Sequence, residues 1–167
     1  AKDRERISNI SVQKGELFAT VQGTAPTPYR VKINFKIIPE EGWKEILQEL
    51  SEKPLNLIKL LNGILPEDII EIFKRHGFPL FIDAEQEGLN ASCSCPDKAI
   101  PCKHIAATIL YTARVLDYNP FFLLKLRGKT KKEILRYFEL GKSTSAENEL
   151  KTRNDKIPGR KKGKKAR

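Results

Sequence analysis

Three cysteines and a histidine lie together within residues 93–104, and this cluster constrains the fold more than any other feature of the chain. Their spacing is Cys-x-Cys-x6-Cys-x-His. Structural Zn²⁺ sites are tetrahedral, and three thiolates with one imidazole are one of their usual ligand sets. The pattern therefore predicts one structural Zn²⁺ ion with four protein ligands: Cys93, Cys95, Cys102 and His104.

The spacing also suits the expected local structure. Alternate residues of an extended strand point to the same side, so Cys93 and Cys95 can bind one ion together. Two prolines in the connecting loop reduce the entropy that closing the loop would cost. Cys102 and His104 stand at the start of a predicted helix over 105–116, whose positive N-terminal end offsets thiolate charge. We therefore expect the zinc site at a strand-to-helix junction.

Other interpretations of the cysteines explain less of the pattern. A Cys93–Cys95 disulfide would be strained and would leave Cys102 without a role. A catalytic Cys102 thiol with His104 as its base would leave two neighbouring cysteines unexplained. A catalytic zinc ion keeps one coordination position open, whereas this set fills all four. The second histidine, His76, is expected at a surface or helix C-terminus, with no role in the site.

No motif in the chain indicates an enzyme. It contains no GxxxxGK[ST] loop, no GxGxxG after a strand and no Ser/His/Asp set. The acidic pairs at 40–41 and 67–68 stand where helices begin, and favourable interaction with the helix dipole accounts for them. We therefore expect no catalytic residue and no small-molecule substrate.

The hydrophobic patterns predict an α+β fold, with a small antiparallel sheet and several packed helices. A hairpin is expected over 7–22 with its turn at Gly15, followed by a strand over 29–38 in which Val31, Ile33, Phe35 and Ile37 alternate with polar residues. A further strand is expected within 79–89. Apolar stripes and flanking Pro and Gly residues predict helices over 39–53, 54–62, 66–77, 105–116, 120–126 and 129–140.

The charge divides the chain into a body and a tail. The chain carries a net charge of +10, and residues 151–167 hold nine basic residues and one acid. The body is therefore close to neutral. Beyond Gly141 the sequence is too polar to bury a core of its own. We predict a single domain over 1–140, with the zinc-binding region at about 89–116, and a flexible basic extension over 141–167.

The zinc-binding region resembles a known family. Residues 93–97 (Cys-Ser-Cys-Pro-Asp) and 101–107 (Pro-Cys-Lys-His-Ile-Ala-Ala) resemble the SWIM zinc finger, whose consensus is CxC…CxH. Segments 20–23, 28–31 and 121–128 are similar to prokaryotic SWIM-finger proteins, so the resemblance covers most of residues 7–128 but not the tail. It implies zinc on the four matched residues. It also implies DNA binding or protein contacts, often beside Swi/Snf-type helicases, transposases or recombination factors.

Two basic segments are candidate phosphate contacts. Flexible, acid-poor runs of Lys and Arg bind nucleic acid through counterion release, although a solvated tail with no partner is the alternative. Gly128 and Thr130 are expected to offer backbone N–H groups to phosphate at a helix start. The candidates are Lys125, Arg127, Lys129, Lys131 and Lys132 in the body, and Arg153, Lys156, Arg160, Lys161, Lys162, Lys164, Lys165 and Arg167 in the tail.

These features favour a non-enzymatic zinc protein that binds nucleic acid mainly through phosphate contacts. A zinc-stabilised body with a basic extension is a plan shared by ribosome-associated proteins, so RNA is favoured over DNA by this analogy. The alternative is a protein-interaction subunit or DNA-binding adaptor that works with a helicase or recombination factor. The chain has no run of about 18 uncharged apolar residues and no signal-peptide pattern. With three cysteines and no disulfide framework, it is expected in the cytoplasm, away from membranes.

Overall fold

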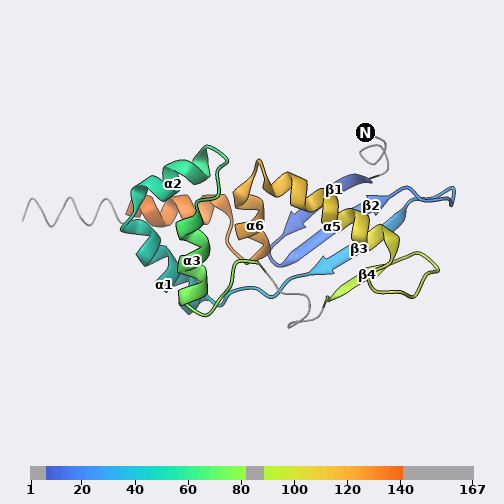
Figure 1. The fold of residues 1–167 in the computed structure, drawn as a ribbon, viewed down its shortest axis with the longest axis horizontal. Helices are drawn as coiled ribbons and strands as arrows, with labels where there is room; N and C mark the ends of the chain where they lie inside the picture. The colour runs from blue at the N-terminus through green and yellow to red at the C-terminus, as the bar shows by residue number, and fades with distance from the viewer. Residues whose placement is uncertain (1–6, 82–88, 141–167) are drawn as a thin grey trace, which may run out of the picture.

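The computed structural model describes residues 7–81 and 89–140 (Figure 1). Its strands are β1 (Ile7–Gln13), β2 (Glu16–Val21), β3 (Tyr29–Asn34) and β4 (Ala91–Cys93). Its helices are α1 (Glu40–Ser51), α2 (Pro54–Leu61), α3 (Glu67–Arg75), α5 (Lys103–Leu116) and α6 (Pro120–Leu126); residues 131–140 are also helical. The predicted α+β class is confirmed. The predicted basic tail lies outside the described residues.

The strands form one antiparallel sheet in the order β1-β2-β3-β4. The turn between β1 and β2 contains Gly15 with φ of 75°, a left-handed conformation that glycine adopts without steric cost. Every second residue of β2 and β3 is buried, so Leu17, Ala19, Val31 and Ile33 form an apolar inner face. The sheet thus has one face that must be covered.

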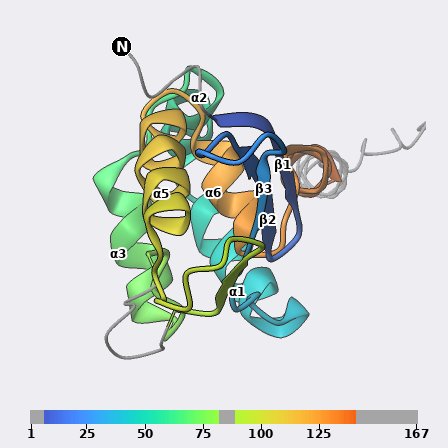
Figure 2. The ribbon, with the colours of Figure 1, turned by 90° about the vertical axis from the view of Figure 1, so that its right-hand side faces the viewer.

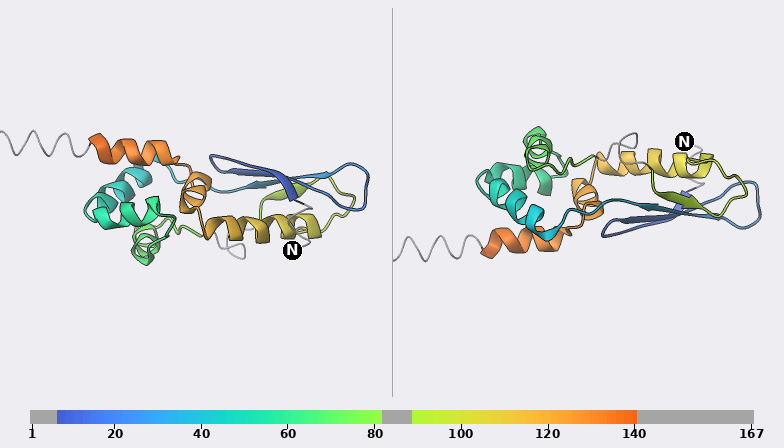
Figure 3. Two further views of the ribbon diagram at one scale, coloured as in Figure 1. Left: turned by 90° about the horizontal axis from the view of Figure 1, so that it is seen from above. Right: turned by 90° about the horizontal axis from the view of Figure 1, so that it is seen from below.

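Helix α5 covers this face. Figures 2 and 3 show α5 running along one side of the sheet. Ile105 at the start of α5 is 1% exposed and belongs to the same apolar cluster as Leu17 and Ile33. Cys102 is in that cluster too. The packing of α5 on the sheet therefore determines where the two C-terminal zinc-ligand candidates lie.

The remaining helices form a second hydrophobic cluster at the opposite end of the molecule (Figure 1). Trp43, Ile46, Leu47 and Leu50 form the predicted buried stripe of α1. The Trp43 ring packs edge-on against Phe73 of α3, with ring centroids 5.3 Å apart. No described helix is long and apolar enough to cross a membrane.

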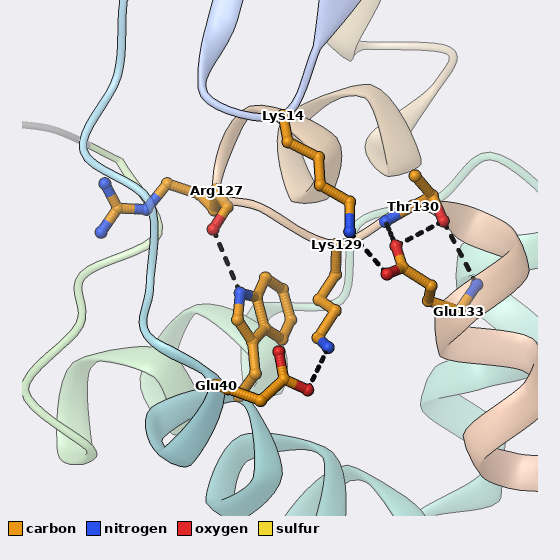
Figure 4. Close-up of polar contacts among 7 residues, drawn as sticks. Lys14, Glu40, Arg127, Lys129, Thr130 and Glu133 are labelled. Carbon is orange, nitrogen blue, oxygen red and sulfur yellow. Dashed lines mark hydrogen bonds and ion pairs between the residues drawn. The ribbon is translucent and has the colours of Figure 1, made fainter.

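The junction between the two clusters is made by the segment after α6. The Trp43 indole N–H donates a hydrogen bond to the backbone carbonyl of Arg127 at 3.1 Å. The Arg127 guanidinium donates to the Lys36 carbonyl at 2.6 Å, and the Lys129 ammonium pairs with Glu40 at 2.5 Å. Figure 4 shows the Arg127 carbonyl facing the indole and Lys129 directed toward Glu40 at the start of α1. Polar groups of this segment therefore join the two halves of the molecule.

The helix over 131–140 begins with a reciprocal pair of hydrogen bonds between Thr130 and Glu133 (Figure 4). The Thr130 backbone N–H donates to the Glu133 carboxylate at 2.9 Å, and the Glu133 N–H donates to the Thr130 hydroxyl at 3.3 Å. This is a capping box. The prediction that Thr130 offers its N–H to phosphate is wrong, because the chain's own carboxylate occupies that donor.

One predicted strand is shorter in the structure, and another can be compared with it only in part. Strand β3 ends at Asn34, because β2 offers no partner beyond Glu16; Ile37 is 54% exposed and the chain turns toward α1. The strand expected over 79–89 falls mostly on residues 82–88, which lie outside the described residues, and residues 79–81 are not in the sheet. The described strand β4 begins at Ala91.

Candidate metal centre

The four predicted ligands converge in space. One ligand atom from each of Cys93, Cys95, Cys102 and His104 lies within 4.8 Å of every other. Zn–S bonds of about 2.3 Å place sulfur atoms of a tetrahedral site roughly 3.8 Å apart, so the donors need move inward only slightly to bind an ion. Among the described residues, no other group of three or more Cys, His or acidic side chains is arranged so that it could hold a metal ion.

Strand β3 positions the first two ligands. Cys93 ends β4 opposite Val31, and the next residue, Ser94, donates its N–H to the Arg30 carbonyl at 3.0 Å. The Arg30 N–H donates in return to the Ser94 hydroxyl at 2.9 Å. Cys95 lies just beyond the strand, where the chain bends back. The two cysteines therefore flank the end of β4, whereas the sequence pattern predicted that both lie within a strand.

Helix α5 positions the other two ligands. Cys102 is the N-cap residue of α5 and is 2% exposed, and His104 stands in the first turn at 6% exposed. This placement agrees with the predicted junction. The His104 Nδ1 atom lies 4.0 Å from the Cys102 sulfur. It is therefore the imidazole nitrogen that faces the cysteine group.

Burial and hydrogen bonds shift the pKa values of two of the cysteine thiols in opposite directions. Burial raises the pKa of Cys93 to about 12; the Cys95 backbone N–H acts to lower this pKa, and the Cys95 and Cys102 side chains raise it. Burial acts to raise the pKa of Cys102 as well, but the backbone N–H groups of Ile105 and His104 and the neighbouring thiols lower it overall. Several thiolates in one half-buried space repel each other, and a divalent cation removes that cost.

The histidine is suited to metal binding in its neutral form. Burial lowers the pKa of His104, and the nearby Lys103 charge lowers it further. A neutral imidazole has a lone pair available for a metal ion. Three thiol ligands and one imidazole, positioned by the end of β4 and the start of α5, fit Zn²⁺. Together they fill all four positions of a tetrahedral site, so none is left for a substrate. The four residues would therefore hold one Zn²⁺ ion as a structural centre.

Two residues that support the site were not predicted. The Tyr29 ring packs against the His104 ring with centroids 4.6 Å apart. Gly23 lies beside both rings: a Cβ atom there would stand 2.6 Å from Tyr29 Cε2 and 3.0 Å from His104 Nε2. The sequence signals were a glycine directly after a strand and the similarity of segments 20–23 and 28–31 to SWIM-finger proteins, and neither gave these residues a role. The contact depends on β2 and α5 meeting, which no local pattern reveals.

The basic candidates of the body separate into two groups. Arg127 and Lys129 are 2% and 8% exposed, and their charged groups bind Lys36 and Glu40 within the fold. They are not presented to a ligand, so the prediction that these two contact phosphate is not supported. Lys131 and Lys132 are exposed and Lys125 is half-buried. The tail candidates lie outside the described residues.

The remaining histidine has a different role from His104. His76 is the C-cap residue of α3, and its imidazole lies 2.9 Å from a Glu49 oxygen and 3.3 Å from a Glu45 oxygen. It therefore links α3 to α1, far in sequence from the metal ligands.

A Cys₃His centre at a strand-to-helix junction defines a zinc finger, and comparison with known families identifies its type. Residues 81–113 match the family model of the SWIM zinc finger. The chain therefore carries a SWIM zinc finger, as the sequence resemblance indicated.

A relative extends the similarity beyond the finger. The chain is 37% identical over 130 residues to Uncharacterized protein Rv2102 of Mycobacterium tuberculosis. The match covers 78% of this chain and 47% of that protein, so the chain spans about half the length of that relative. No solved structure matches the chain.

Proposed function

We propose that this chain is a non-enzymatic zinc-binding protein that binds nucleic acid, with RNA favoured over DNA, mainly through phosphate contacts. The zinc centre stabilises the junction between sheet and α5. The basic surface lies elsewhere, on the helix over 131–140 and the tail that follows it in sequence. A ribosomal or other RNA-rich assembly in the cytoplasm is the proposed setting.

The observation that supports this proposal most directly is the exposed face of the last described helix. Lys131, Lys132 and Arg136 line one shallow surface groove there, with Glu139 as its one acid. The chain continues from this helix into a tail with nine basic residues between 151 and 167. Cations along one helix face and the adjoining segment can neutralise successive phosphates.

The finger helix supports phosphate contact over base recognition. Base reading requires several Arg, Asn or Gln side chains directed into a groove. Helix α5 instead uses Ile105, Thr108 and Thr112 for packing, and Arg114 is its only arginine. Phosphate contacts position a protein without reading sequence. We therefore expect recognition of nucleic-acid shape and backbone.

Salt dependence of binding tests the proposal. The zinc-loaded chain should bind a fluorescent RNA hairpin with a log–log salt slope of roughly −0.7 to −0.9 per neutralised phosphate. Truncation after Leu150 should remove most of that slope. The triple variant Lys131→Gln, Lys132→Gln, Arg136→Gln should reduce it further. A matched triple variant on the other helices (Lys44→Gln, Lys59→Gln, Lys74→Gln) removes the same charge and should leave the slope unchanged.

Two further measurements separate the proposal from the protein-adaptor alternative. Co-migration with ribosomal subunits in a gradient of native lysate supports an RNA-rich setting. Partners that remain bound after nuclease treatment favour a protein-interaction subunit. An unchanged salt slope after truncation would contradict the role assigned to the tail.

A further inference from the structure

A groove of about 640 Å³ lies between α5 and the loop that joins β2 to β3. The loop side is made by Gln22, Gly23 and Thr24, and the helix side includes Lys103, Leu110 and Arg114. The groove is separate from the basic face of helix 131–140 described above.

One wall of the groove contains a buried imidazole nitrogen to which no described residue forms a hydrogen bond. The His104 Nε2 atom has no hydrogen-bond partner among the described residues, and the side chain is only 6% exposed. Nδ1 faces the Cys102 sulfur, whereas Nε2 faces Gly23 on the other side of the ring. When Nδ1 serves as the metal ligand, Nε2 carries the proton. A metal-bound imidazole usually donates this proton to a carboxylate or carbonyl oxygen.

The groove presents positive charge and apolar surface together. Lys103 and Arg114 are its charged lining residues, and no acidic residue of the described chain lines it. Between them lie small or apolar side chains, including Ala107 and the 67% exposed Leu110. An exposed apolar strip of this kind beside convergent polar groups is typical of a recognition groove.

We propose that this groove binds a peptide segment of a partner protein in which a carboxylate side chain is flanked by apolar residues. The carboxylate accepts a hydrogen bond from the Nε2–H group of His104 and faces Lys103 and Arg114. The neighbouring apolar side chains of the peptide cover Ala107 and Leu110. The apolar lining favours a peptide over a nucleic-acid backbone, because sugar and phosphate groups bury little apolar surface.

Selection from a random peptide library against the zinc-loaded full chain tests this assignment. We expect enrichment of peptides with Asp or Glu between apolar residues, and at least tenfold weaker binding when that acid is changed to its amide. Arg114→Gln and Leu110→Ser alter exposed positions and should each reduce the affinity of an enriched peptide at least tenfold. Lys44→Gln and Leu61→Ser remove one positive charge and one exposed leucine outside the groove and should leave the affinity unchanged.

Nitrogen-detected NMR of the imidazole supplies a second readout. The zinc-loaded chain should show Nε2 protonated, with its proton resonance shifting when an enriched peptide is added. A metal-bound Nε2, or a library without acidic enrichment, would overturn the proposal. The proposal would also be overturned if the His104 resonance responded to inorganic phosphate or an RNA oligonucleotide but to no peptide. The groove would then be a phosphate-binding site. None of these results depends on the salt slope that tests nucleic-acid binding.

Discussion

The indole nitrogen of Trp43 lies 3.1 Å from the backbone oxygen of Arg127, which also accepts the Ile38 N–H at 2.9 Å. This carbonyl thereby joins α1, the segment between β3 and α1, and the end of α6. It stands between the two hydrophobic clusters and is shielded from water by the 1% exposed Trp43 ring. The mutual position of sheet and helices depends on this contact.

Trp43→Phe should therefore reduce the free energy of unfolding by about 1 kcal/mol beyond the change in packing, because a buried carbonyl loses one of two donors. Denaturant unfolding of the zinc-loaded protein measures the loss. Trp43→Leu, which also opens a cavity, should cost more. Equal stability of wild type and Trp43→Phe would show that the indole hydrogen bond contributes nothing.

Removal of zinc should loosen the junction of β4 and α5, because metal affinity at a site formed by folding is folding free energy. Cys102→Ser should have the same effect. Metal analysis should find one zinc per chain, and X-ray absorption should give Zn–S distances of about 2.3 Å and a Zn–N distance of about 2.0 Å. Full stability and helicity after verified zinc removal would contradict a structural role.

Gly23→Ala should weaken zinc binding, because its Cβ would meet the Tyr29 ring at 2.6 Å and His104 Nε2 at 3.0 Å. A competition titration with a chelating dye measures the affinity. Gly77→Ala is the matched control: its Cβ meets nothing within 4 Å, but its φ of 75° strains an alanine. The control should lose about 1 kcal/mol of stability and keep its zinc affinity. Equal zinc affinity in both variants would contradict the assigned role of Gly23.

Acid should selectively weaken the cap of helix 131–140. The Lys14 ammonium, followed by the Thr130 hydroxyl and N–H, lowers the pKa of Glu133 from 4.5 to about 2. A carboxylate with a depressed folded-state pKa stabilises the fold above its unfolded pKa, and this stabilisation is lost as pH falls from about 4.5 toward 2. Glu133→Gln should therefore be less stable than wild type at pH 6, with a difference that shrinks below pH 4.5.

Chemical denaturation at a series of pH values measures this difference. Glu71→Gln, at an exposed position of α3, serves as the control and should differ little from wild type throughout. A Glu133→Gln difference that stays constant from pH 6 to pH 3 would show that the capping box does not depend on the carboxylate charge.

Much of the site could be predicted because its information is local. The four ligands lie within residues 93–104, and Cys102 and His104 are placed by the helix that starts beside them. Cys95 was expected in the same extended strand as Cys93 but lies beyond the end of β4, because strand length depends on the pairing that the neighbouring strand offers. The same reason explains why β3 ends at Asn34 although apolar alternation continues to Ile37.

The sequence by itself determined the ligand set, the α+β class and the concentration of charge in residues 151–167, since each depends on residue type and short-range spacing. Only the tertiary structure decided which basic side chains remain exposed and available to bind a partner. Arg127 and Lys129 belong to the same basic run as Lys131 and Lys132, yet the first two are buried against Lys36 and Glu40. Those partners lie about 90 residues away in the chain. Whether a charge faces solvent or a buried carbonyl depends on long-range packing, which no local pattern of the basic run contains.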